Sequence, residues 1–247
     1  DALVYRMLVL NTGQVPWNIS RQLEVVYKSL IKEIKEKVGE IDRLLTNDDP
    51  GRRVKAGEYQ SSDLIELYLD FSSRKTKVDT KEAISEQFAK LDFVENLSRP
   101  DFQSYFYTSL SSLVKLDKTF SRHDSADASR FSKGKNIFDS QPARVGFVVA
   151  FALHILGRPG ATLPSPEEAS QKAKDVGTRI DAFCAKLDSM SPGELESFLR
   201  LDVLQQTVEV RSGKVGEYER EVFLEGFKVL IEDHSGLDSM EPCWRAR

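Results

Sequence analysis

Several features that mark common protein classes are missing from this 247-residue chain. Its two cysteines, Cys184 and Cys243, are too few for a disulfide framework or a cysteine-based zinc site, so a reducing compartment is the simplest expectation. The three histidines are far apart in the sequence and do not have the spacing of metal ligands. No run approaches the roughly 18 apolar residues of a membrane-spanning helix, and no signal peptide is visible. These absences favour a soluble, cytoplasmic protein with no membrane partner and no metal site.

An excess of positive charge and the common catalytic motifs are also missing. The formal net charge is −4, which provides no general attraction to nucleic acid but leaves room for local basic patches. The chain contains no Walker phosphate-binding loop, no His-Glu-x-x-His motif and no Cys-x-x-Cys pair. The residues therefore identify no nucleophile and no general base, and whether the protein is an enzyme stays open.

Apolar residues recur at helical spacing through most of the chain. A stripe from Ile19 to Ile41, at intervals of three and four, predicts a long first helix, with Glu40 to Leu45 as its last turn. Further stripes follow, including one from Asp79 to Val94 and one after Pro100. The sequence predicts a mainly α fold, in which a short N-terminal strand and turn lead into a multi-helix bundle.

Changes in composition divide the chain into five segments. Residues 1–17 form the strand and turn, 18–120 a first helical part, 121–136 a polar loop, 137–232 a second helical part, and 233–247 a flexible tail without periodicity.

The segment from Pro142 to Leu156 is apolar nearly all round, which predicts a central, buried helix. Arg144 near its start is expected to pair with a carboxylate, and His154 is expected to be a core residue rather than a ligand. Ser165 and Ser191, each followed by proline, are expected to cap the next two helices.

A polar turn precedes the first helix. Leu8 to Leu10 is a short apolar run, Gly13 permits a positive φ, and Pro16 keeps Val15 out of the helix. The free N–H groups and the positive dipole end of the following helix suit an anion such as phosphate. An ordinary strand-to-helix connection explains the same residues.

Leu10-Asn11-Thr12-Gly13-Gln14, followed by Gln22-Leu23-Glu24, resembles the second motif of ParB-like domains. It is closer still to the Leu-Asn-Thr-Gly turn of the DGQHR and GmrSD-type relatives, which act in DNA modification and phage defence. Leu10 stands where the ParB-like pattern has an acidic residue, and Gln14 where it has arginine. The resemblance implies that a nucleotide triphosphate with Mg²⁺ binds here. The implied contacts are Asn11, Thr12, Gly13, Gln14 and, from the first helical turn, Arg21.

The family's first motif lies upstream of this one in its members and does not occur in this chain, which opens at Asp1 without methionine. We therefore expect an N-terminal portion or a partner subunit to complete the site. As an enzyme, the protein would be a nucleotide-dependent hydrolase or nuclease with half of its site outside this chain. The alternatives are a non-catalytic helical protein-interaction module and a DNA-binding regulator without catalysis.

One set of cations is a candidate for contact with DNA, and a second charged surface could touch phosphate. The first comprises Arg52, Arg53, Lys55, Arg74, Lys75 and Lys77, which a DNA-binding protein would gather on one face. Exposure of the loop between 47 and 60, and the dipole of the helix ending near Ser73, explain these cations equally well. The second is the polar face of the first helix, whose mixed signs favour an ordinary solvated surface. That face carries Lys28, Lys32, Glu33, Lys35, Glu36 and Lys37.

Overall fold

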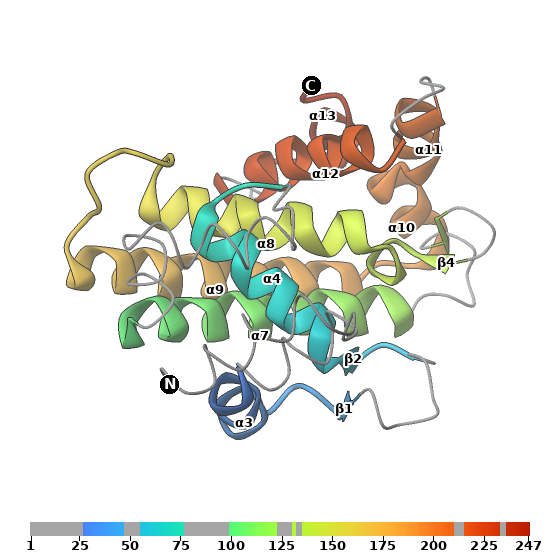
Figure 1. The fold of residues 1–247 in the computed structure, drawn as a ribbon. Coiled ribbons are helices and arrows are strands. Elements are labelled where there is room, and N and C mark those ends of the chain that lie inside the picture. The colour runs from blue at the N-terminus through green and yellow to red at the C-terminus, as the bar shows by residue number, and fades with distance from the viewer. Residues whose placement is uncertain are drawn as a thin grey trace.

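The computed structural model describes residues 27–46, 55–76, 99–122, 130–131, 135–209, 215–232 and 236–247. The described part is mainly α-helical, which confirms the predicted fold class (Figure 1). The strand expected at Leu8 to Leu10 and the helix expected from Asp79 to Val94 lie outside the described residues. No described helix has the length and apolar character needed to cross a membrane.

The elements follow one another along the chain with these bounds. They are α3 (Lys28–Lys37), β1 (Arg43–Leu45), β2 (Glu58–Gln60), α4 (Ser61–Ser73), α7 (Pro100–Arg122), β3 (Arg130–Phe131), β4 (Lys135–Asn136), the 3-10 helix η2 (Ile137–Asp139), α8 (Gln141–Leu156), α9 (Pro166–Asp188), α10 (Pro192–Leu199), α11 (Leu201–Glu209), α12 (Val215–Glu232) and α13 (Glu241–Trp244).

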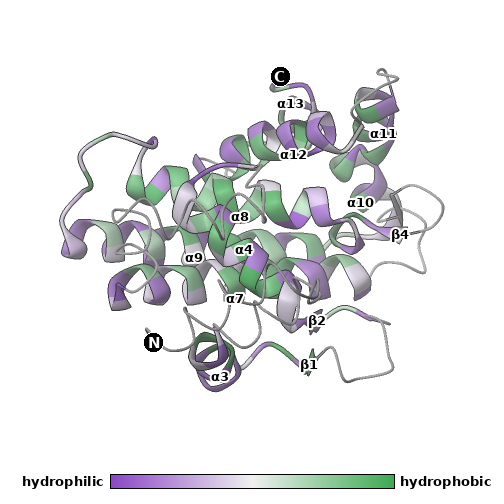
Figure 2. Cartoon of the chain, in the orientation of Figure 1, coloured by the Kyte–Doolittle hydropathy of each residue, from purple (hydrophilic) through white to green (hydrophobic). Residues whose placement is uncertain are grey.

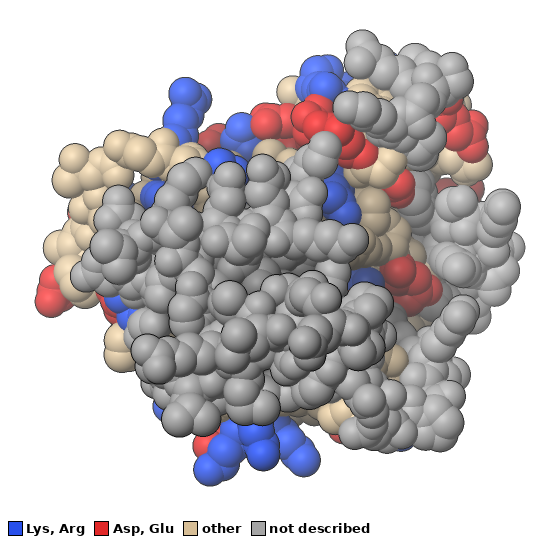
Figure 3. Space-filling model, in the orientation of Figure 1, with Lys and Arg blue, Asp and Glu red and all other residues tan. Residues whose placement is uncertain are grey.

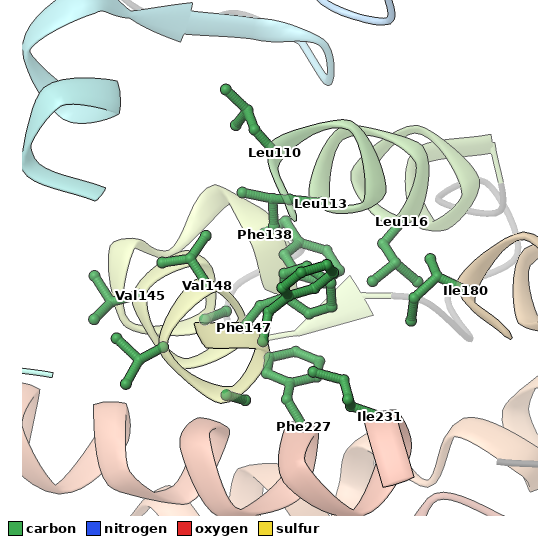
Figure 4. Packing of buried hydrophobic residues seen from close by; sticks show 14 of the residues in the cluster. Leu110, Leu113, Leu116, Phe138, Val145, Phe147, Val148, Ile180, Phe227 and Ile231 are labelled. Atoms are coloured by element: carbon green, nitrogen blue, oxygen red, sulfur yellow. The ribbon is translucent and has the colours of Figure 1, made fainter. Parts of the chain in front are cut away.

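Helix α8 is the centre of the bundle, as its apolar sequence predicts. It packs against α4, α7, α9 and α12 (Figure 1), and its side chains from Ala143 to Ala152 are buried. Figure 4 shows Phe147 of α8 beside Phe227 of α12, whose ring centroids are 5.5 Å apart in an edge-on arrangement. Gly146 lets α8 and α12 approach closely, because a Cβ there would meet the Phe223 Cβ at 2.6 Å.

One hydrophobic cluster runs through both predicted helical parts, from Leu30 to Trp244. Figure 2 shows its apolar residues on the inner sides of the helices, with hydrophilic residues on their outer sides. The expected caps are confirmed: the hydroxyl oxygen of Ser165 accepts from the Glu168 N–H, and that of Ser191 from the Glu194 N–H.

A parallel strand pair replaces the expected last helical turn and part of the expected loop. Arg43 to Leu45 pair in register with Glu58 to Gln60. The fully buried Asp117 carboxylate of α7 accepts hydrogen bonds from the Gly57 N–H (3.2 Å) and the Tyr59 hydroxyl (2.5 Å). Since α7 holds β2 through these long-range bonds, the local sequence pattern could not predict the pair.

Residues 236–247 are packed, which corrects the expectation of a flexible tail for this part of the range 233–247. Met240, Cys243 and Trp244 are buried, and the Trp244 indole N–H donates to the Leu199 carbonyl oxygen at 2.7 Å. Helix α13 has only four residues, too few to show a periodicity. Tertiary contacts with α10, α11 and α12, rather than local propensity, stabilise this segment.

Candidate nucleic-acid interface

Helix α3 has one apolar and one basic side. Leu30, Ile34 and Val38 are buried. Lys28, Lys32 and Lys35 are exposed, and their spacings of four and three residues place them on one side of the helix. Figure 3 shows lysine and arginine side chains gathered at the lower edge of the view, below the position of α3 in Figure 1. An exposed basic strip therefore runs along α3, and we call Lys28, Lys32 and Lys35 the α3 lysines.

Three carboxylates of this region, those of Glu33, Glu40 and Asp42, are bound by side chains of α7. The Tyr107 hydroxyl donates a hydrogen bond of 3.0 Å to the Glu33 carboxylate. Burial raises the pKa of Tyr107, and Glu33 raises it further, so the phenol keeps its proton and remains a donor. Two more side chains of α7 donate to carboxylates in the same way. Ser111 donates to Glu40 (2.7 Å), and Lys118 donates to Asp42 (2.7 Å).

Within the described segments, the lysines of α3 form few ion pairs with carboxylates. Lys32 lies 3.8 Å from Glu36, with side chains 77% and 59% exposed, so this ion pair is weak. Lys28, Lys35 and Lys37 form no ion pair with any residue that the structure describes. The tertiary structure thus separates part of the charges that are mixed in the sequence, because Glu33 faces α7 while the lysines and Glu36 face solvent. Such a surface attracts phosphate groups in a salt-dependent way.

Of the six cations in the first predicted set, the structure describes Lys55, Arg74 and Lys75. It does not bring them together: Lys55 precedes β2 at one end of α4, and Arg74 and Lys75 follow its other end, roughly 18 Å away by helical rise. The Arg74 guanidinium donates to the carbonyl oxygens of Leu156 (3.3 Å) and Arg158 (3.4 Å). Arg74 therefore caps the C-terminus of α8.

The remaining predicted site residues lie outside the described residues. For the nucleotide site these are Asn11, Thr12, Gly13, Gln14 and Arg21, and for the basic set Arg52, Arg53 and Lys77.

A second polar group joins α4, α8 and α12. Arg144, buried as expected of a residue on the central helix, pairs with Asp63 at 3.5 Å, which confirms the predicted carboxylate partner. The Gln141 amide donates to Glu66 (3.1 Å) and accepts from the Arg220 guanidinium (3.2 Å). Burial, and then the neighbouring Asp63, raise the pKa of Glu66.

This polar group has the character of a structural network. Among the described residues, no group of three or more histidine, cysteine or carboxylate side chains is arranged to hold a metal ion. His154, expected in the core, is only partly buried, and burial followed by the charge of Arg179 lowers its pKa.

Comparison of the chain with known protein families, with curated proteins and with solved structures finds no match. The candidate interface is therefore defined by the geometry of α3 and α7 alone.

Sequence reasoning undervalued the α3 lysines because Glu33 and Glu36 lie among them. The available signal was the spacing of positions 28, 32 and 35, which puts three lysines on one side of a helix. The deciding fact is the contact between Glu33 and Tyr107, residues 74 positions apart.

Proposed function

We propose that this chain is the helical portion of a ParB-like, nucleotide-dependent protein of DNA modification or antiphage defence, and that α3 contacts nucleic acid. The observation that supports nucleic-acid contact is the separation of charge on α3, where the lysines face solvent and Glu33 is bound by Tyr107. Lysine ammonium groups on flexible stems are suited to phosphate oxygens, and binding through them depends strongly on salt.

The nucleotide-dependent part of the proposal rests on the resemblance of the segment from Leu10 to Gln14. In this proposal Asn11 and its neighbours contact a triphosphate with Mg²⁺, and an upstream portion or a partner subunit supplies the rest of the site. Residues 10–14 precede α3 in the chain, so a nucleotide site and a nucleic-acid surface would belong to consecutive segments.

The first test measures binding of the chain to fluorescein-labelled duplex DNA by fluorescence anisotropy. Neutralising the three α3 lysines to glutamine is expected to weaken binding by at least tenfold at low salt, since fewer counterions are released from the DNA when fewer phosphates are neutralised. A control variant removes the same charge elsewhere, at Lys172, Lys174 and Lys228 of α9 and α12. Contact of α3 with nucleic acid would be overturned if the two variants bound DNA with equal affinity, or if the α3 variant bound as tightly as the natural chain.

The second test is calorimetry with ATP, CTP and GTP in the presence of Mg²⁺, on the natural chain and on Asn11→Ala. Nucleotide binding that Asn11→Ala abolishes would support the ParB-like assignment. DNA binding with no response to any nucleotide would favour the DNA-binding regulator. A chain that binds neither ligand would favour the helical protein-interaction module.

A further inference from the structure

We infer that the α3 face binds the phosphodiester backbone of duplex DNA without reading its sequence. This inference rests on the proposed function, because it specifies the kind of contact that α3 makes.

The residue types on the exposed side of α3 carry the argument. The exposed positions of the helix are lysine, serine and glutamate, at 28, 29, 32, 35, 36 and 37. Bases are read chiefly through paired hydrogen bonds from arginine or lysine to guanine and from asparagine or glutamine to adenine, and α3 contains no arginine, asparagine or glutamine. Single-stranded nucleic acid is bound by stacking on exposed aromatic rings, and the exposed positions of α3 include none. Lysine is a compact charge on a flexible stem, which suits contact with phosphates, and phosphate contacts position a protein on the duplex without reading its sequence.

The length of the basic strip fits several phosphates. Lys28 and Lys35 are seven residues apart, which is roughly 10 Å along the helix axis. Duplex DNA carries one phosphate charge per about 1.7 Å of its own axis. The strip is therefore longer than the axial spacing of the phosphates, so more than one phosphate can lie beside it when the helix lies along the duplex.

Contacts within the protein hold the side of α3 that faces away from the basic strip. Leu30, Ile34 and Val38 are buried, and Tyr107 binds Glu33 from α7. Glu36 is the only carboxylate at an exposed position of α3, and its side chain is 59% exposed. It opposes phosphate, so Glu36→Gln is expected to increase DNA affinity by a few-fold.

The experiment compares two labelled duplexes of equal length and unrelated sequence, titrated with the full chain between about 50 and 200 mM salt. The natural chain is expected to bind both duplexes equally. Neutralising the α3 lysines to glutamine should reduce the slope of log affinity against log salt by about 2.7, or about 0.9 for each phosphate that a lysine no longer neutralises. The control variant at Lys172, Lys174 and Lys228 should keep the slope of the natural chain.

The outcomes separate the inference from the proposed function. Binding that differs tenfold or more between the two duplexes would overturn sequence independence while leaving nucleic-acid contact in place. If the α3 substitutions lower the affinity but leave the slope unchanged, contact of these lysines with phosphates is overturned, because the contacts that were removed then release no counterions. If the natural chain binds no duplex at low salt, the proposed function fails, and the inference fails with it.

Discussion

Replacing Gly146 by alanine should destabilise the protein, although alanine is the better helix former. Gly146 lies in α8 where this helix meets α12. An added Cβ would stand 2.6 Å from the Phe223 Cβ and 2.8 Å from the Leu224 backbone nitrogen. Because these neighbours include backbone, they cannot rotate away, and the two helices must separate.

The size of the effect follows from two opposing contributions. Overpacking of a well-packed core costs about 1–3 kcal/mol, and more where backbone must move. The helix propensity of alanine over glycine returns about 1 kcal/mol. We expect Gly146→Ala to lower the free energy of unfolding by about 1–2 kcal/mol. In a domain of this size that lowers Tm by about 2–4 °C for each kcal/mol.

Gly177 of α9 is the matched control. A Cβ at this position would lie 3.8 Å from the Thr108 Cγ2 and 3.9 Å from the Ser112 Oγ, which is ordinary van der Waals contact. Gly177→Ala therefore gains the propensity without the clash and should stabilise the protein by about 0.5–1 kcal/mol. The two substitutions are chemically identical and have opposite expected signs.

Urea denaturation followed by far-UV circular dichroism measures both variants. The midpoint should fall for Gly146→Ala and rise for Gly177→Ala, with unchanged m-values. A midpoint for Gly146→Ala equal to or above that of the natural chain would refute the packing of α8 against α12 through this glycine.

Three other predictions concern the C-terminus, the buried carboxyl and the support of α3. Trp244→Ala should lower the free energy of unfolding by about 3–5 kcal/mol, because it removes a fully buried ring and leaves the Leu199 carbonyl oxygen without its donor. Urea denaturation measures this loss, and a value below about 1 kcal/mol would mean that the C-terminal segment does not pack against α10. The raised pKa of Glu66 means that its ionised form opposes folding, so Glu66→Gln should stabilise the protein at pH 7. That gain should vanish as pH falls below the ordinary value of 4.5, where the carboxyl is protonated in both states, and a gain independent of pH would contradict the assignment. Tyr107→Phe should lower stability by about 1.5 kcal/mol, and a double-mutant cycle with Glu33→Ala, which removes the acceptor, should show that most of this loss is coupling. Additive losses would exclude the hydrogen bond.

Local chemistry explains why many helices could be predicted. Ser165 and Ser191 cap helices with the following proline in the first turn, and these starts depend on residues within one helical turn. The apolar character of the segment from Pro142 to Leu156 likewise predicted the most buried helix without knowledge of its neighbours. Arg144 was expected to have a carboxylate partner, since a buried cation requires one, but its identity as Asp63 was not predictable.

The candidate interface was only half predictable. The lysines at 28, 32 and 35 could be placed on one side of a helix from their spacing alone. The direction taken by Glu33 depends on Tyr107, which reaches it from another helix. Similarly, Arg74 was expected to contact DNA or to complement the dipole of the helix that ends near Ser73, and in the structure it caps α8, across 82 residues of sequence.

Contacts between neighbours within a few residues make the helical class, the caps, the apolar faces and the burial of α8 readable from the sequence. The tertiary structure sets what depends on residues far apart in the chain. It pairs β1 with β2 beside Asp117, docks Trp244 on Leu199, and turns Glu33 toward Tyr107 so that the lysines remain outside. The physical reason is the range of the interactions. Helix periodicity and capping are short-range, whereas the partner of a buried carboxylate or indole is chosen by how the helices pack.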